Sequence, residues 1–377
     1  MIDNQKGIFI RSVLTIVFIL VILFFLLDFR QIKETQEAPS ASYKKAKAPE
    51  AYTKKAIPAG YNEPFLSHRK TRVVASGSYI YWQPSQQNFF VGQKLNSDIL
   101  TSSNITRSTK DFNFEYQSGF KAGLGFIFPQ DNWSLYAEYI RLHSNPQTKL
   151  TTSDPNFMQS AWVPVIGPSN PDVSQMTNHW HFHFDLLDLN LLRGFYVGKS
   201  LVVSPFITGR GVRIHQSLKA TTYYTADAGP SSNEANYKQK SLQVGPRLGS
   251  DLHWLLGNGF KFSGKLGAAL LYNRSHTSNH IPYTVDGEII NDHFSTTQGS
   301  FCPNIDMGVG FGWENKNNFG ISVCYDILTF FNQNNVGNNQ VLNDLGVALD
   351  LYATPYGFQS QNNLTLHGLT VTAKIAF

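Results

Sequence analysis

Four side chains of metal-binding type are spaced two residues apart near the middle of the chain: His179, His181, His183 and Asp185. Alternate residues of a strand face the same side, so a strand here would place all four on one face. Such a strand brings only adjacent pairs close together, and a tetrahedral site would need a ligand from another strand. We interpret these residues as a polar inner wall or an external rim of the fold, and we expect no metal.

The two cysteines, Cys302 and Cys324, would both face inward on neighbouring strands. A simple hairpin about residues 314–318 leaves them several residues out of register. A disulfide needs Cα atoms within about 7 Å. The spacing therefore predicts no bridge between these two residues.

Motifs of enzymes and of nucleotide binding are missing from the sequence. It contains no Gly-x-Ser-x-Gly elbow and no phosphate loop, and Gly308-x-Gly310-x-Gly312 does not precede a strand-to-helix transition. These three glycines are better explained as small inward residues that leave room for a bulky neighbour. We expect neither enzymatic activity nor a cofactor.

The segment 112–128 predicts a long amphipathic strand. Phe112, Phe120, Leu124 and Phe126 share one parity with other apolar residues, and the opposite parity is polar or glycine. Similar alternation recurs, and it predicts ten strands near residues 72–83, 112–128, 133–143, 179–192, 201–216, 241–254, 260–273, 301–313, 319–331 and 364–377.

The connections between these strands alternate in length. Five long loops, near 84–110, 144–178, 217–239, 274–299 and 332–362, alternate with four short turns. Transmembrane barrels have this asymmetry, with short periplasmic turns and long external loops, whereas a soluble sandwich gives no reason for it. The sequence therefore predicts an all-β, antiparallel transmembrane barrel of about ten strands. The number must be even, so a missed strand, such as one at 341–351, must come with a partner and would raise it to twelve or more.

Charged residues occupy the parity that would line such a barrel. The predicted pore-lining residues are five acids and five bases: Glu115, Lys121, Glu138, Arg247, Asp251, Lys261, Lys265, Asp306, Asp326 and Lys374. Aromatic residues near the strand ends predict interfacial girdles: Tyr79, Tyr81, Trp82, Trp133, Trp180, Trp254, Trp313 and Tyr325.

The N-terminal 70 residues differ in composition from the rest. Residues 12–27 are apolar and follow Lys6 and Arg11, which predicts that residues 1–30 are a signal peptide or an uncleaved N-terminal anchor. Residues 31–70, rich in Lys, Ala and Pro, predict a disordered basic linker, and residues 71–377 the barrel. The net charge of +5 comes from residues 1–70, so we expect no nucleic-acid partner.

With its strands laid out, the chain resembles the pore-forming major outer membrane protein family of Legionella and chlamydia-like bacteria. The resemblance is carried by residues 119–144 (GFKAGLGFIFPQDNWSLYAEYIRLHS), 186–217 and 244–260, and by the C-terminal LTLHGLTVTAKIAF. It implies a porin-like channel for small hydrophilic solutes. It also leaves open cross-links between copies through Cys302 or Cys324, and a homo-oligomer.

Two functions remain open on the residues alone. Eight strands leave an interior that side chains fill and open porins use sixteen or more, so a non-conducting structural or surface-adhesion barrel is the alternative to a channel. The expected partners are membrane lipid and lipopolysaccharide, small solutes or ions, and the barrel assembly machinery. Phe377, the C-terminal aromatic residue of the last strand, resembles the signal by which outer-membrane barrels are recognised for insertion.

Overall fold

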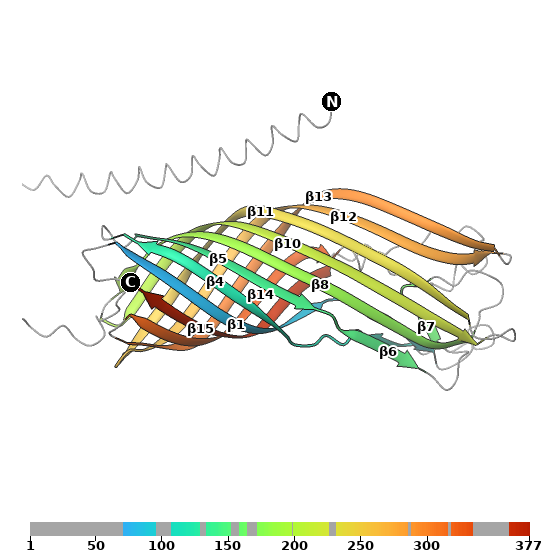
Figure 1. The fold of residues 1–377 in the computed structure, drawn as a ribbon, viewed down its shortest axis with the longest axis horizontal. Coiled ribbons are helices and arrows are strands. Elements are labelled where there is room, and N and C mark those ends of the chain that lie inside the picture. The colour runs from blue at the N-terminus through green and yellow to red at the C-terminus, as the bar shows by residue number, and fades with distance from the viewer. Residues whose placement is uncertain are drawn as a thin grey trace, which may run out of the picture. The chain divides into compact units, whose positions relative to one another are not determined.

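The structure is a computed structural model that describes residues 71–95, 107–128, 133–151, 158–163, 172–197, 199–225, 231–285, 288–315, 318–334 and 362–377. It consists of strands and their connections (Figure 1). The strands are β1 (Arg72–Gln86), β2 (Phe90–Leu95), β3 (Arg107–Asp111), β4 (Gln117–Ile127), β5 (Trp133–Ser144), β6 (Gln147–Thr151), β7 (Met158–Ser160), β8 (Asp172–Arg193), β9 (Phe195–Val197), β10 (Leu201–Thr225), β11 (Ser231–Gly257), β12 (Phe260–Val285), β13 (Glu288–Glu314), β14 (Phe319–Asn334) and β15 (Asn362–Ala376). No helix long and apolar enough to cross a membrane occurs among the described residues.

Ten strands close into an antiparallel ring. The large sheet has twelve strands in the order β6-β8-β5-β4-β1-β15-β14-β13-β12-β11-β10-β9, and an additional pairing of β8 with β10 closes it. β6 pairs with β8 beyond the end of β5, and β9 pairs with β10 beyond the end of β8. Neither is therefore an additional strand of the ring. Each strand of the ring pairs with a neighbour on both sides, so the ring has no open edge strand, which a lipid environment requires.

All ten strands predicted from the sequence are present, but four of the predicted loops contain further strands or long extensions of the predicted ones. The predicted loop 84–110 contains β2 and most of β3, and 144–178 contains β6, β7 and the start of β8. Residues 217–239 and 274–299 were expected to be loops, but β10–β11 and β12–β13 continue through most of them as hairpins. In Figure 1 these hairpins run well beyond the ends of β1, β14 and β15. The predicted strand 112–128 also starts late, because β4 begins at Gln117.

An apolar band covers the outside of the ring near its short turns. On β13 the outward residues Phe301, Val309 and Phe311 are each more than half exposed, and β11 exposes Leu248 and Trp254 in the same way. At about 3.4 Å per residue and a tilt of about 40°, the run from Phe301 to Trp313 spans roughly 30 Å, close to the apolar height of a membrane barrel. Water would not favour such a surface, so the band is the part that faces lipid.

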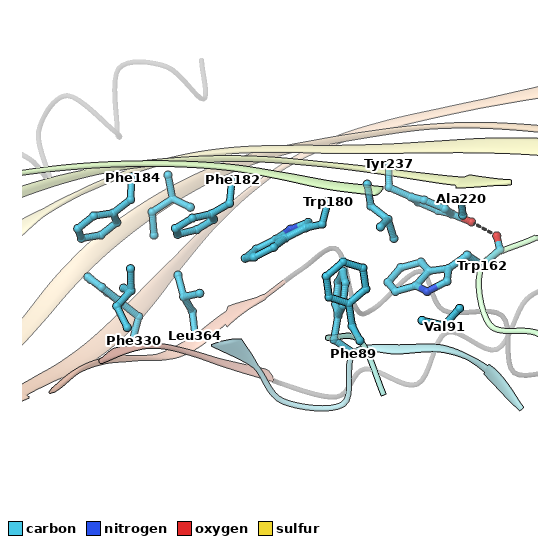
Figure 2. Close-up of a cluster of buried hydrophobic side chains, with 14 of the residues drawn as sticks. Phe89, Val91, Trp162, Trp180, Phe182, Phe184, Ala220, Tyr237, Phe330 and Leu364 are labelled. Carbon is cyan, nitrogen blue, oxygen red and sulfur yellow. Dashed lines mark hydrogen bonds between the residues drawn. The ribbon is translucent and has the colours of Figure 1, made fainter. Parts of the chain in front are cut away.

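Beyond this band, toward the long hairpins, the apolar side chains face the interior and the polar side chains face outward. On β8 the residues Trp180, Phe182 and Phe184 point inward and are fully buried, while His179, His181 and His183 lie on the outer face. Figure 2 shows the aromatic side chains of β8 in a row, facing Phe330 and Leu364. Trp82 and Trp180 were expected in an outer girdle, but both are buried inside. In the long-hairpin part of the molecule, therefore, the apolar core is internal.

The two ends of the described chain meet at the seam of the ring. β15 pairs with β1 along its length, and Val73 and Phe377 exchange two backbone hydrogen bonds of 2.9 and 3.0 Å. The turn Gly257-Asn258-Gly259 joins β11 to β12 with positive φ at all three residues, a conformation that glycine and asparagine tolerate best. The predicted signal or anchor (1–30), the linker (31–70) and the conditional strand 341–351 lie outside the described residues.

Candidate functional site

A buried layer of ion pairs crosses the interior of the ring. Arg210 on β10 lies directly opposite Asp188 on β8, and its Nε and Nη2 donate hydrogen bonds of 2.8 and 2.7 Å to the two carboxylate oxygens. The side chains of Arg210 and Asp188 are 3% and 2% exposed. A bidentate pair of this kind is strong and geometrically specific.

A second arginine extends the layer. Arg247 on β11 is fully buried and makes a two-bonded pair with Asp306 on β13, with Nε donating to Oδ1 at 2.7 Å. Arg210 also reaches Asp306, at 3.2 Å, and donates to Asn304. β10 and β13 are separated by two strands in the ring, so these contacts run across the lumen and not along its wall.

Two further ion pairs lie on the side of the layer that faces the short turns. Lys121 on β4 reaches Asp326 on β14 at 2.7 Å, and Thr370 donates to the same carboxylate. Near the turn between β13 and β14, Lys261 pairs with Glu314 at 3.0 Å. Each carboxylate named here is therefore matched by a cation.

On the other side of the layer an apolar plug fills the interior. The rings of Phe184 on β8 and Phe330 on β14 lie 5.9 Å apart, although these strands stand on opposite sides of the ring. Farther out, Trp162 and Phe89 pack on each other, and Phe89 also contacts Trp180 (Figure 2). We call the cluster of Phe89, Trp162, Trp180, Phe182, Phe184 and Phe330 the apolar plug.

Inward glycines make room for the charged layer. A Cβ on Gly267 would lie 2.7 Å from Nη2 of Arg247 and 2.9 Å from Oδ1 of Asp306. A Cβ on Gly308 would lie 2.7 Å from Oδ1 of Asp326. The small residues expected at Gly308, Gly310 and Gly312 therefore do stand beside bulkier inward neighbours.

The ten residues predicted to line a pore are placed as follows. Lys121, Arg247, Lys261, Asp306 and Asp326 take part in the ion pairs above. Glu138 faces Asp188 on the neighbouring strand, Asp251 faces Lys265, and Lys374 is opposite Ser76 on β1. Glu115 is exposed and lies outside the strands, between β3 and β4. Whether these residues border a path for ions stays a prediction.

Arg210 and Asp188 were not among the residues predicted from the sequence to line the interior. The signal that was available is the spacing of Arg210 and Arg213, which differ by three and so must face opposite sides of one strand. Asp188 has the same parity as Phe184 and Leu186, which makes it inward.

The histidine series and the cysteines lie apart from this layer. His179, His181, His183 and Asp185 lie on the outer face of β8, which agrees with the predicted external rim and contradicts the alternative of a polar inner wall. Within the described residues, no three His, Cys, Asp or Glu side chains are grouped as a metal site. Cys302 is buried and Cys324 is opposite Gly310, so no bridge joins them, as predicted.

Residues 68–377 match the family described as Legionella pneumophila major outer membrane protein precursor. The chain belongs to this family. The family and the ring place the protein in the bacterial outer membrane, with its short turns on the periplasmic side and its long hairpins outside.

Among solved structures, the outer membrane protease OmpT from Escherichia coli is similar, with 11% identity, a TM-score of 0.42 and coverage of 81% of this chain and 96% of that one. The CymD monoaromatic hydrocarbon channel has 8% identity and a TM-score of 0.27, covering 86% and 93%. A Pseudomonas aeruginosa FadL homologue has 6% identity and a TM-score of 0.26, covering 85% and 94%. These TM-scores are too low to carry an argument about function. No curated protein matches the sequence.

Proposed function

We propose that this protein is a structural, surface-exposed barrel of the outer membrane whose interior is closed to solutes and whose long external hairpins meet the surroundings. The observation that carries the proposal is the contact of side chains across the lumen. Phe184 and Phe330 come from opposite sides of the ring, and Arg210 joins β8 to β13 in a layer whose side chains are 10% exposed or less. The role is non-enzymatic.

The second candidate is the porin-like channel for small hydrophilic solutes. One observation favours it: the periplasmic half of the interior is lined by charged side chains, among them Lys265, Asp251 and Glu138, as a water-filled lumen would be. For this candidate the ion pairs and the apolar plug would have to rearrange before ions pass. The closed barrel requires no rearrangement, so we prefer it.

Single-channel recording on the purified, heat-modifiable full chain in a planar bilayer separates the two. A large open porin, reconstituted in parallel, controls for insertion. We expect no unitary steps from the wild type. Regular, ohmic steps at low voltage would contradict the closed barrel.

If such steps occur, Lys265→Glu should shift the reversal potential toward cations. Lys110→Glu, an exposed residue of β3 outside the ring, is the matched control and should leave it unchanged.

We further propose that Phe377 is the residue by which the barrel assembly machinery recognises this chain. Phe377 is 68% exposed on the lipid side of the seam, and its backbone joins the last strand to the first. A side chain that the closed barrel does not bury can serve recognition without any cost in packing.

A further inference from the structure

The outer face of the barrel is strongly asymmetric in charge at the edge of its apolar band. Along each strand the outward series changes from apolar to polar at one position, which marks the external edge of the lipid-facing surface. On five consecutive strands, β5, β8, β10, β11 and β12, the first outward residues beyond the band are Arg141, Asp185, Arg213, Lys240 and Arg274. Four of these five are basic side chains.

The other five strands have no Lys, Arg, Asp or Glu as their first outward residue beyond the band. On β13, β14, β15, β1 and β4 the corresponding residues are Gly299, Thr329, His367, Gln83 and Ser118. This side instead has an aromatic edge, where the rings of Tyr81 and Tyr116 stack and the hydroxyl of Tyr325 forms a hydrogen bond of 2.8 Å with His367. An ordinary interfacial girdle therefore covers half the ring, and a basic surface covers the other half.

A row of histidines lies next to the cations, one outward position farther from the apolar band. His143, His183 and His215 are cross-strand neighbours on β5, β8 and β10, and His215 is opposite Lys240 on β11. The rings of His143 and His183 lie 4.3 Å apart. We call Arg141, Arg213, Lys240, Arg274, His183 and His215 the basic belt.

Positive charge is crowded in the belt. In this external row, beyond the lipid-facing band, burial and then the neighbouring His143 and Arg141 lower the pKa of His183. Burial and then Lys240 lower the pKa of His215. Among the side chains described in these two rows, Asp185 is the one carboxylate, and Arg141 approaches it to 3.8 Å. The belt therefore repels further cations and favours an anion.

The position of the belt identifies the anion. Side chains at the end of an apolar band lie at the level of lipid headgroups, and cations there attract anionic lipids. Arginine binds phosphate oxygens through its planar donors, and adjacent strands are about 4.8 Å apart. Arg213 on β10 and Arg274 on β12 are both opposite Leu242 on β11, so they stand about 10 Å apart with space for a phosphate between them. Between Arg141 and Arg213, by contrast, lies Asp185.

We propose that the basic belt binds the phosphorylated headgroup of an outer-leaflet lipid, with a phosphomonoester group held between Arg213 and Arg274 beside Lys240, and its acyl chains lying on the apolar band below. This site goes beyond the closed-barrel function and does not depend on whether the interior conducts. The sequence led us to expect a lipid partner; the proposal adds which side of the ring binds it and which chemical group is recognised.

The test uses the full chain in a neutral detergent, titrated with a bisphosphorylated glycolipid, its enzymatically dephosphorylated form, and a soluble bisphosphorylated sugar without acyl chains. Binding is followed by native mass spectrometry and by the shift of the heat-modification temperature. The belt variant is Arg213→Gln with Lys240→Gln and Arg274→Gln. The matched control, with the same charge change, is Lys94→Gln with Lys110→Gln and Lys149→Gln, all exposed in the external part.

We expect the belt variant to bind the phosphorylated lipid at least tenfold more weakly than the wild type, and the control within twofold of it. The wild type should bind the dephosphorylated lipid as weakly as the belt variant binds the phosphorylated one. Both variants must keep heat-modifiable mobility, which shows that they fold. Equal binding of both lipids, or an unaffected belt variant, would overturn the proposal. Equally tight binding of the soluble sugar would refute a lipid as the ligand.

Discussion

Replacing Arg210 with methionine tests whether the ion-pair layer is dry. In Arg210→Met the carboxylate of Asp188, whose side chain is 2% exposed, loses two charge-assisted hydrogen bonds of 2.7 and 2.8 Å. Bonds to charged groups contribute about 1.5–3 kcal/mol each, and breaking a buried ion pair costs about 3–5 kcal/mol. We therefore expect a loss of about 4 kcal/mol in the free energy of unfolding, or about a thousandfold in the folding equilibrium.

A double-mutant cycle isolates the pair. In Asp188→Leu the guanidinium of Arg210 still pairs with Asp306 at 3.2 Å and still donates to Asn304. This single change should therefore lower the free energy of unfolding by less, about 1–3 kcal/mol. In the double variant no unpaired charge remains, and we expect stability within about 2 kcal/mol of the wild type. Arg213→Met is the matched control, because Arg213 is exposed on the outer face of the same strand; it should change stability by less than about 0.5 kcal/mol.

The measurement is equilibrium urea unfolding in a neutral detergent, followed by tryptophan fluorescence and by heat-modifiable mobility. A loss below about 1 kcal/mol for Arg210→Met would mean that water solvates Asp188, since exposed ion pairs contribute no more than this. The dry layer, and with it the main argument for a closed interior, would then be wrong.

Two further predictions concern packing and assembly. Gly267→Ala should lower the free energy of unfolding by about 1–3 kcal/mol in the same assay, because its Cβ would lie 2.7 Å from Arg247. Gly209→Ala is the control and should cost much less, because nothing lies within 4 Å of its Cβ. Equal losses for the two variants would contradict the close approach at Gly267. Deleting Phe377 removes two backbone bonds to Val73 as well as the exposed ring, so the amount of heat-modifiable barrel in the outer-membrane fraction should fall more than for Tyr223→Ala, an exposed external aromatic. Phe377→Ala keeps the backbone bonds, and wild-type amounts of that variant would show that the seam matters and the ring does not.

The ten strands were predictable because lipid imposes a strict rule. A strand that faces lipid must keep one parity apolar over its whole membrane length, as Leu248, Leu252 and Trp254 do on β11. Such a pattern is rare by chance over many residues, so the ring could be predicted from the sequence alone. Only local alternation was needed.

The orientation of β8 was not predictable by the same rule, because its apolar parity changes along the strand. Leu187 and Leu189 face outward in the lipid-facing part, whereas Phe182 and Phe184 face inward beyond it. A single parity assigned to the whole strand must fail in one half. The partners of Arg210 were hidden for another reason, since contacts between β10 and β13 depend on the closure of the ring and leave no local pattern.

The change of parity also bears on the choice between a closed barrel and a channel. The external hairpins have no lipid beside them, so their apolar residues can be buried only inside the ring. The apolar plug is therefore the hydrophobic core of this part of the molecule. Burying each large apolar side chain contributes about 1.5–3 kcal/mol, so its six residues contribute on the order of 10 kcal/mol, comparable to the whole stability of an ordinary domain. A conducting path through the plug would expose part of this core to water, so we expect it to destabilise the hairpins that surround the plug.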